Sequence, residues 1–250
     1  MRNVFIDFEA SQYTQEIISV GAVADTGEEF YSLVNTKHTI GRFVSELTGI
    51  NQKDIYKAKT ADCVFDDLYS WLYDLTDDSS KIQFICYGNC DMSFAINTLK
   101  SLKWSMCAQM VLSLIICNMV DYSEYVKSYF GLSRHIGLLK VAQYYSNNYD
   151  LVQTHNALDD AKMLKFIYEN VQKGEPMVDN PFEEYMQRIE LYDNDGNLIE
   201  TFYGMAQAVK WISEINKMPA GSHRNRIVNK ILAASQQKKS YCGFNWVVSN

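Results

Sequence analysis

Val4-Phe-Ile-Asp-Phe-Glu-Ala10 is the stretch of sequence on which the interpretation of the whole chain depends. Val4–Phe8 is apolar toward both faces, a pattern typical of a central strand that is covered on both sides. Asp7 and Glu9 stand two residues apart, so on a strand their carboxylates point to the same face. Two anions at the end of a buried strand are costly unless a cation compensates them. For this pair alone, the simplest interpretation is a strand that leaves the core at Asp7.

Strand-like and helix-like patterns alternate around this stretch. Further strands are predicted over Glu16–Ala24, Glu29–Val34 and Ile82–Tyr87. Helical spacing is found in five segments, which are Phe65–Leu75, Asp91–Leu102, Tyr122–Phe130, Gly137–Tyr145 and Ala157–Gln172. The pattern of Val111–Met119 fits either a strand or a buried helix. Strands that come first and then alternate with helices predict an α/β domain with a mixed central β-sheet flanked by helices.

A segment rich in breakers separates this domain from a smaller one. Two of the three prolines fall within residues 173–182, which predicts a domain over residues 1–172, a linker over 173–184 and a module over 185–250. The module has eight basic and five acidic side chains, whereas acidic side chains dominate the rest of the chain. A small α+β module is predicted from strands Ile189–Tyr192 and Leu198–Phe202, helices Met205–Ile215 and His223–Ala234 with Ser222 as N-cap, and a final strand Tyr241–Val248.

The composition narrows the functional class. Of 250 residues, 47% are hydrophobic and 21% are charged, which excludes a disordered or collagen-like chain. The net charge of −7 argues against a uniformly basic nucleic-acid coat protein but is compatible with a nuclease, whose metal ions add positive charge of their own.

No targeting or membrane segment is expected from the sequence. Acidic residues interrupt the N-terminal apolar run, so no signal peptide is expected, and Met106–Val120 is too short to span a membrane. Six cysteines without a CxxC pair are expected to be reduced thiols in a cytoplasmic protein.

Asp91 is a further acidic position at the end of a predicted strand. It follows Ile82–Tyr87 and a Gly-Asn-Cys turn, at the point where a helix is expected to begin. Taken alone, it is most simply interpreted as an N-cap or first-turn acid that complements the helix dipole.

The segment His155-Asn-Ala-Leu-Asp-Asp-Ala161 adds a histidine and an inward carboxylate. If a helix starts near Ala157, Asp160 shares a stripe with Ala157 and Ala161 and faces the core, whereas Asp159 is rotated toward solvent. His155 precedes the helix on a loop and can therefore lie beside Asp160. An inward carboxylate next to a histidine is unusual without a ligand. The alternative is a surface histidine and a capping acid.

Together these residues are far more specific than any one of them. The carboxylates of Asp7, Glu9, Asp91 and Asp160 would repel one another unless divalent metals lay among them. Oxygen ligands of this kind suit Mg²⁺ or Mn²⁺ rather than zinc. Two such ions, about 4 Å apart, stabilise the attacking and leaving oxygens of a phosphodiester, and His155 would deprotonate the attacking water.

At this point the sequence resembles a known family. Phe5–Ala10, Tyr87–Asp91 and His155–Ala161 resemble the three exonuclease motifs of the DEDDh superfamily, which includes the proofreading subunit of bacterial DNA polymerase III, ribonuclease T and oligoribonuclease. Glu46–Ile50 and Leu138–Ala142 match two further segments commonly seen between those motifs. The resemblance extends over the whole of the predicted first domain. It implies a ribonuclease H-like fold and metal-dependent 3′→5′ hydrolysis of DNA or RNA that releases nucleoside 5′-monophosphates.

The resemblance also implies a role for each matching residue. Asp7, Glu9 and Asp160 would hold one ion, Asp7 would bridge to a second ion supported by Asp91, and His155 would be the general base. Four contacts to the substrate are implied as well, from Leu47 and Thr48 against the terminal base and from the backbone of Phe8 and Ala10 near the terminal sugar. The first motif continues as Glu9-Ala-Ser-Gln12, where many DNA-directed relatives have Glu-x-Thr-Gly, and this departure favours RNA.

The predicted module resembles the small DNA-binding repeats of homing endonucleases. Its second helix carries Arg224, Arg226 and Lys230, which could contact a phosphate backbone. The alternatives are a small interaction domain with a solvated charged face, or a domain that recruits a protein. For the whole chain, the leading hypothesis is a 3′→5′ exonuclease with an appended nucleic-acid-binding module. The alternative is a catalytically silent binding or adaptor protein on an exonuclease scaffold.

Overall fold

The computed structural model describes residues 2–76, 81–174, 182, 185, 187–215 and 224–249, except for the side chains of Ala206, Arg224 and Asn225. The chain divides into two compact units. The first unit comprises Met1–Glu124 and Gly137–Pro176, and the second unit comprises Tyr125–Ile136 and Met177–Asn250. None of the described helices combines the length and the apolar character needed to cross a lipid bilayer. All six cysteines are free thiols, as expected from their spacing.

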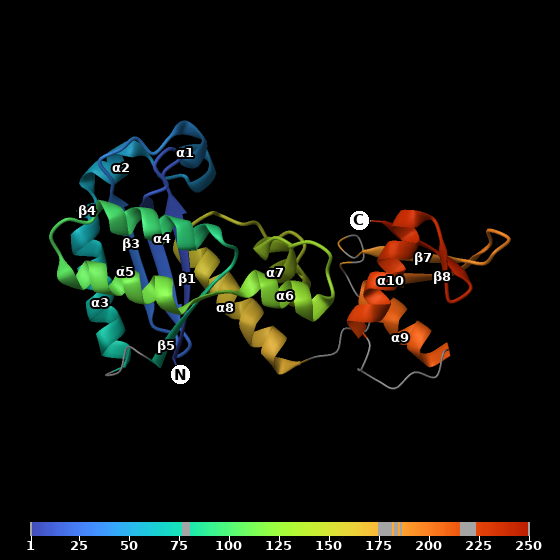
Figure 1. Ribbon diagram of the computed structural model, residues 1–250. Coiled ribbons are helices and arrows are strands. Elements are labelled where there is room, and N and C mark those ends of the chain that lie inside the picture. The colour runs from blue at the N-terminus through green and yellow to red at the C-terminus, as the bar shows by residue number, and fades with distance from the viewer. Residues whose placement is uncertain are drawn as a thin grey trace. The chain divides into compact units, whose positions relative to one another are not determined.

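A six-stranded mixed sheet forms the centre of the first unit (Figure 1). Its strands lie in the order β4-β3-β2-β1-β5-β6. They are β1 (Arg2–Ala10), β2 (Ile17–Ala24), β3 (Glu29–Asn35), β4 (Lys59–Thr60), β5 (Ile82–Cys86) and β6 (Met119–Asp121). Because β1 is antiparallel to β2 and parallel to β5, both kinds of pairing meet at the central strand. The mixed central sheet predicted from the sequence is confirmed.

Helices follow and connect these strands, and the helix at Tyr122–Phe130 lies mostly in the second unit. They are α1 (Arg42–Thr48), α2 (Gln52–Lys57), α3 (Ala61–Leu75), α4 (Cys90–Ser101), α5 (Met106–Asn118), α6 (Tyr122–Phe130), α7 (Leu138–Ser146) and α8 (Ala157–Lys173). Figure 1 shows α4 and α5 lying across the strands. Helix α8 contacts β1 and β2 along its length.

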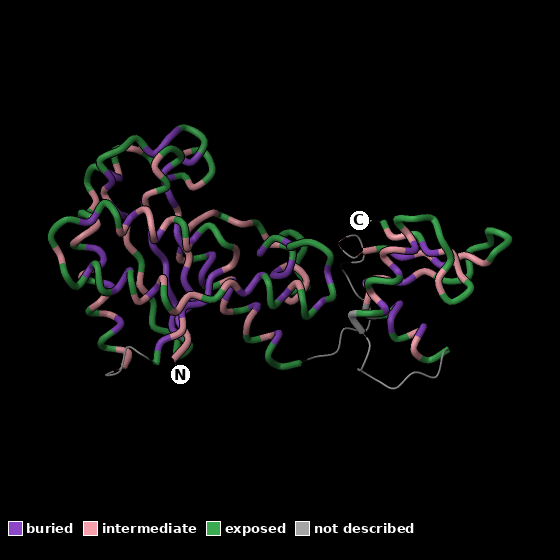
Figure 2. The backbone as a smooth tube through the Cα atoms, viewed as in Figure 1, coloured by how far each residue is buried: buried purple, intermediate pink, exposed green. Residues whose placement is uncertain are grey.

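Alternation along β1 explains how both faces of the sheet are covered. Val4, Ile6 and Phe8 belong to a core that includes residues of α3, α4 and α5. The ring of Phe5 instead packs against Tyr168 of α8, with 5.1 Å between the ring centres. Figure 2 shows that burial is concentrated along the strands. Even-numbered residues of β1 therefore face α3, α4 and α5, and odd-numbered residues face α8.

The segment whose pattern fitted either a strand or a helix is largely helical. Ala108, Val111, Leu112 and Ile115 are buried at spacings of three and four residues, which is the pattern of a helix with one face in the core. The helix ends at Asn118, and the chain then continues as the short strand β6, which pairs with β5.

The second unit contains a four-stranded sheet and two long helices. The sheet has the order β8-β7-β10-β9. The elements are β7 (Arg188–Tyr192), β8 (Leu198–Tyr203), α9 (Met205–Ile215), α10 (Arg224–Gln237), β9 (Ser240–Tyr241) and β10 (Phe244–Ser249). Ile189, Leu191 and Trp246 of the sheet pack against Ile212 of α9 and Ile231 of α10. This arrangement is a small α+β core.

Some details of the second unit differ from the sequence prediction. Ser222 and His223, predicted to start a helix, lie outside the described residues. Helix α10 continues past Ala234 to Gln237, because the Ser235 hydroxyl accepts a hydrogen bond of 3.0 Å from the backbone N–H of Val248 and fixes this end of the helix to β10. The boundaries 1–172, 173–184 and 185–250 remain a proposal.

Candidate metal centre and active site

Asp7 and Glu9 lie near the C-terminal end of β1, on the face of the sheet that α8 covers. Both side chains are partly buried. In the pairing of β1 with β2, Asp7 is directly opposite Gly21, and Glu9 is opposite Ser19. The strand pattern thus delivers two carboxylates to one side of the sheet, as the spacing predicts.

Gly21 allows α8 to reach this pair. A Cβ atom added at Gly21 would lie 2.2 Å from the backbone carbon of Ala157 and 2.2 Å from the backbone nitrogen of Leu158. The first turn of α8 therefore rests directly on the backbone of β2, beside Asp7. No residue with a side chain fits there without moving the helix.

The sequence before α8 fixes where this helix begins. Asn156 is the N-cap, and its side chain accepts hydrogen bonds from the backbone N–H groups of Leu158 and Asp159. His155 precedes the cap and has a φ of 52°, a left-handed conformation that is uncommon outside glycine. Asp160 is 3% exposed, on the buried face of the helix that the spacing indicates.

Three of the predicted residues converge on one point. Ligand atoms of Glu9, His155 and Asp160 all lie within 4.8 Å of one another, which is close enough for a single metal ion. Asp160 Oδ2 accepts a hydrogen bond of 2.6 Å from the Gln153 amide. Its Oδ1 is buried without any hydrogen-bond partner. A buried carboxylate oxygen without a partner is costly, so the donor set fits a bound cation.

Asp91 reaches the site from the other face of the sheet. It lies in the first turn of α4 and is 5% exposed. The pairing of β1 with β5 ends at Phe5, so the N–H of Phe8 is not bonded to that strand and donates to Asp91 Oδ1 at 3.0 Å. This hydrogen bond holds the Asp91 carboxylate at the strand that carries Asp7 and Glu9.

Asp121 was not identified from the sequence but supports Asp91. Its Oδ1 accepts hydrogen bonds from the backbone N–H of Gly88 at 2.8 Å and from that of Ser123 at 2.9 Å. The first bond fixes the turn that leads into α4, and the second fixes the start of α6. The sequence did carry a signal, because an Asp followed by Glu124 three residues later is a helix-start pattern.

The carboxyls crowd one another enough to shift their pKa values. Burial, and then the charges of Asp91, Asp160 and Glu9, raise the pKa of Asp7 well above its usual range. Burial, and then the charges of Asp160 and Asp91, raise the pKa of Glu9 to about 8. Burial raises the pKa of Asp91 to about 7, and burial also raises the pKa of Asp160. Without a cation the cluster therefore retains protons at neutral pH, and a divalent cation would replace them.

The residues predicted to contact the substrate lie on α1 and β1, outside the group formed by Glu9, His155 and Asp160. Leu47 lies on α1 and is 40% exposed, and the neighbouring Thr48 hydroxyl donates to the Val44 carbonyl at 2.8 Å. Phe8 and Ala10 are buried in β1 on either side of Glu9.

The predicted cations of the second unit lie on α10. Arg226 is exposed, and the Lys230 ammonium lies 5.3 Å from the centre of the Tyr241 ring. The side chain of Arg224 lies outside the described part of the chain.

Comparison with known proteins agrees with this geometry. The sequence profile of an exonuclease family, RNase T, matches residues 4–168. No curated protein sequence matches the chain significantly. The matched segment covers about two thirds of the chain and includes every residue of the cluster at the end of β1.

Several solved exonuclease structures share the fold at low sequence identity. A 3′-exonuclease that recognises the 3′-end of a histone mRNA stem-loop has a TM-score of 0.58 and 20% identity, over 70% of this chain and 64% of that chain. The nuclease domain of 3′hExo, a DEDDh family member bound to rAMP, has a TM-score of 0.56 and 19% identity, over 80% and 97%. Cell-death related nuclease 4 has a TM-score of 0.51 and 15% identity, over 99% and 80%.

The present chain spans less than two thirds of the first of these structures. The likenesses confirm the predicted ribonuclease H-like fold, with a mixed central sheet flanked by helices. At the end of its central strand, this fold gathers an acidic and histidine cluster that is able to hold a divalent metal. The chain belongs to the exonuclease family of RNase T.

Proposed function

We propose that this protein is a divalent-metal-dependent 3′→5′ exonuclease that releases nucleoside 5′-monophosphates. The observation that supports this proposal most directly is the cluster of Glu9, His155 and Asp160, whose ligand atoms lie within 4.8 Å of one another. Asp7 and Asp91 belong to the same charge cluster, because the charge of Asp91 raises the pKa values of Asp7 and Glu9, and the charges of Asp160 and Glu9 also raise that of Asp7. A binding protein or adaptor would have no need to keep such a costly set of buried acids.

Asp7, Glu9 and Asp160 would hold one ion, and Asp7 with Asp91 would hold a second. Carboxylate oxygens are the ligands that Mg²⁺ and Mn²⁺ prefer, and the unpartnered Asp160 Oδ1 fits such an ion. When bound, two divalent ions stabilise the attacking and leaving oxygens and make a bound water more acidic.

His155 is the proposed general base. Its ring lies beside the carboxylates of Glu9 and Asp160, which stabilise the imidazolium that forms when it takes a proton from the attacking water. As the new P–O bond forms, the bond to the 3′ oxygen breaks. The leaving oxygen then gains a proton from solvent, and His155 returns its own proton to solvent. The hydrogen-bonded cap at Asn156 keeps the histidine in place through this cycle.

The substrate is proposed to enter with its 3′ end at the end of β1. Leu47, exposed on α1, would pack with Thr48 against the terminal base, and the backbone at Phe8 and Ala10 would lie near the terminal sugar. RNA is the favoured polymer. This preference follows from the Glu9-Ala-Ser-Gln12 continuation of the first motif, and a neighbouring structure is described as acting at the 3′-end of an mRNA stem-loop.

A time course on 5′-labelled single strands of RNA and DNA of matched sequence tests the proposal. With Mg²⁺ or Mn²⁺ we expect a ladder that shortens from the 3′ end, no cleavage in EDTA, and faster cleavage of RNA. His155→Ala should lower kcat by about 10²- to 10⁴-fold, which is the usual contribution of a general base. Asp7→Ala should abolish cleavage.

His135→Ala is the matched control, because this exposed histidine lies outside the cluster. It should cleave like the unaltered protein. Immediate release of the 5′ label as a mononucleotide would contradict the 3′→5′ direction. Full activity of both His155→Ala and Asp7→Ala would refute the proposed site. Absence of cleavage in the unaltered protein would favour the binding or adaptor protein instead.

The second unit is proposed to bind nucleic acid through α10. Arg226 and Lys230 are exposed on this helix, one turn apart, so their charges point in a similar direction. Such cations contact phosphates without reading sequence. The competing assignment, a domain that recruits a protein, predicts that these cations do not affect nucleic-acid affinity.

A further inference from the structure

A second cleft lies at the same edge of the sheet as the carboxylate cluster. Its volume of about 590 Å³ falls within the range of sites for small molecules and cofactors. The start of β2, the end of β3, the start of α3 and the end of α4 form its walls, together with the connection between α4 and α5. All of these elements belong to the first unit.

Trp104 stands at the rim of this cleft on an anchored backbone. The Asp62 carboxylate of α3 accepts hydrogen bonds from the backbone N–H groups of Trp104 at 3.2 Å and Ser105 at 2.8 Å. The Ser105 hydroxyl also bonds to the Asp66 carboxylate. The backbone is thus fixed at several points, yet Trp104 is 87% exposed. Tryptophan is largely buried in most proteins, so an exposed ring on an anchored backbone points to a ligand.

Two lysines of the lining are available to contact the phosphates of a ligand. Lys37 and Lys103 line it, are exposed and form no ion pair within the described chain. The two acids of the lining are already bonded within the protein. Asp62 binds the connection that carries Trp104, and Glu16 Oε2 accepts from the Thr36 hydroxyl at 2.8 Å. His38 Nε2 lies 3.8 Å from this same oxygen.

Helix α4 connects the cleft to the catalytic cluster. Asp91 lies in its first turn and Thr98 lines the cleft, both on the buried face of the helix and about 10 Å apart along its axis. The Thr98 hydroxyl accepts a 2.8 Å hydrogen bond from the N–H of Ile17, which fixes α4 to β2. Ile17 also lines the cleft and pairs with Ala10, next to Glu9. The cleft is therefore adjacent to the carboxylate cluster at the end of β1 but separate from it.

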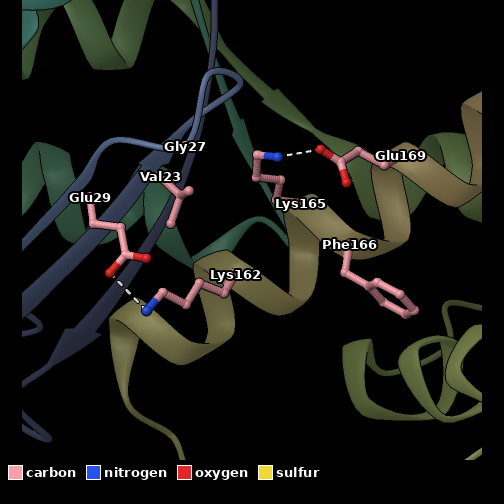
Figure 3. A pocket seen from close by; sticks show the side chains of 7 residues that line it. All are labelled: Val23, Gly27, Glu29, Lys162, Lys165, Phe166 and Glu169. Atoms are coloured by element: carbon pink, nitrogen blue, oxygen red, sulfur yellow. Dashed lines mark hydrogen bonds and ion pairs between the residues drawn. The ribbon is translucent and has the colours of Figure 1, made fainter.

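A smaller hollow of the same unit lacks these properties. It has a volume of about 290 Å³ and lies between α8 and the turn that joins β2 to β3 (Figure 3). Its two lysines are already paired, Lys162 with Glu29 at 2.8 Å and Lys165 with Glu169. It offers a partly exposed Phe166 but no unpaired cation.

We propose that the cleft beside Trp104 binds a nucleotide of the substrate strand on the 5′ side of the cleaved end. The base stacks on the Trp104 ring, and the flanking phosphates lie beside Lys37 and Lys103. This inference rests on the proposed exonuclease function, because it assigns the cleft to the same strand. It predicts that longer strands bind more tightly than strands too short to reach the cleft.

Equilibrium binding of the full chain in EDTA tests this without cleavage. The probes are a labelled dinucleotide and a labelled decanucleotide of RNA, measured by fluorescence anisotropy. Stacking on one aromatic ring contributes about 5- to 150-fold in affinity per base, so Trp104→Ala should weaken decanucleotide binding by that factor and leave the dinucleotide unchanged. Trp104→Tyr, which can still stack, should retain most of the affinity.

A salt series tests the phosphate contacts. Lys37→Gln and Lys103→Gln should each reduce the slope of log K against the logarithm of the salt concentration by about 0.7.

Tyr73→Ala is the matched control, since Tyr73 is an exposed aromatic residue of α3 outside the cleft. It should bind both probes normally. Equal binding of the decanucleotide by Trp104→Ala and the unaltered protein would overturn the inference, as would tight binding of a free mononucleotide that depends on Trp104. Cleavage with Mg²⁺ is measured in parallel. If cleavage fails while the length-dependent binding persists, the proposed catalytic function is wrong, and only the binding of a nucleic-acid strand in the cleft stands.

Discussion

Gly21 is the residue on which the close approach of α8 depends. It lies opposite Asp7 in the sheet, and the backbone of Ala157 and Leu158 occupies the space where a side chain would be. The contact is with backbone atoms of a helix, so a small rotation of a side chain cannot relieve it. A methyl group here would push back the helix that carries Asp160 and separate the two halves of the cluster.

Gly21→Ala should therefore cost both stability and metal binding. We expect a loss of about 3 kcal/mol or more in the free energy of unfolding, at the upper end of the range for overpacked cores. Urea unfolding and Mn²⁺ titration measure the two effects. Gly137→Ala is the control, because a Cβ atom at Gly137 would have no neighbour within 4 Å. Unchanged stability and Mn²⁺ affinity in Gly21→Ala would show that α8 is free to shift.

At the level of elements, the turn between β5 and α4 decides where Asp91 lies. This turn is held from outside by Asp121 at the end of β6, which accepts the N–H of Gly88. Asp121 is also one of the charges that raise the pKa of Asp91. Its two effects, positioning and charge, can be separated by mutation.

Asp121→Asn keeps an acceptor oxygen, whereas Asp121→Ala leaves the N–H groups of Gly88 and Ser123 without it. An unsatisfied buried group costs about 1–3 kcal/mol, so the alanine variant should lose that much stability and about tenfold or more in kcat. The asparagine variant should keep its stability. It should also shift the pH dependence of kcat/KM to lower pH, because a charge that raises the pKa of Asp91 is gone. Identical behaviour of both variants would exclude the positioning role.

Much of this arrangement was predictable from the sequence, and the reasons differ between elements. A period of two places Asp7 and Glu9 on one face of a strand, and helical spacing places Asp160 on the buried face of α8, because both are local properties. Gly21 acts through its contact with Ala157 and Leu158, far away in the chain, which no local pattern contains. Helices α1 and α2 are only seven and six residues long, too short for a periodic signal.

At the scale of the whole molecule, the crowded carboxyls link stability to pH and metal. The pKa values of Glu9 and Asp91 are raised in the folded protein, so the folded state binds more protons than the unfolded state between about pH 4 and about pH 8. The free energy of unfolding of the metal-free protein should therefore fall as the pH rises through this range. Mg²⁺ should raise Tm more at about pH 8 than at about pH 5, because protons compete with the ion.

Thermal unfolding in EDTA and in Mg²⁺ at both pH values measures this. Glu9→Gln, which removes one of the titrating groups, is the internal control and should flatten the pH dependence in EDTA. A metal-free Tm that does not change between the two pH values would show that the cluster does not retain protons.

The charge of the second unit gives a separate prediction. If α10 binds phosphates, Arg226→Gln together with Lys230→Gln should weaken binding of single strands of any sequence and lower the salt slope by about 1.4. Arg188→Gln is a suitable control, because the guanidinium of Arg188 is already paired with Glu190 at 2.6 Å. Filter binding across a salt series provides the measurement. An unaltered slope would favour recruitment of a protein partner.

The two halves of the cluster lie at opposite ends of the first unit's sequence, with Asp7 and Glu9 in its first strand and His155 and Asp160 at its last helix. During synthesis, the growing chain holds its strand carboxylates long before the histidine has been added. Only after α8 has left the ribosome and settled on the glycine of β2 does the centre become complete. The proposed exonuclease is therefore inert until the chain has been made through α8 and this helix has packed on β2.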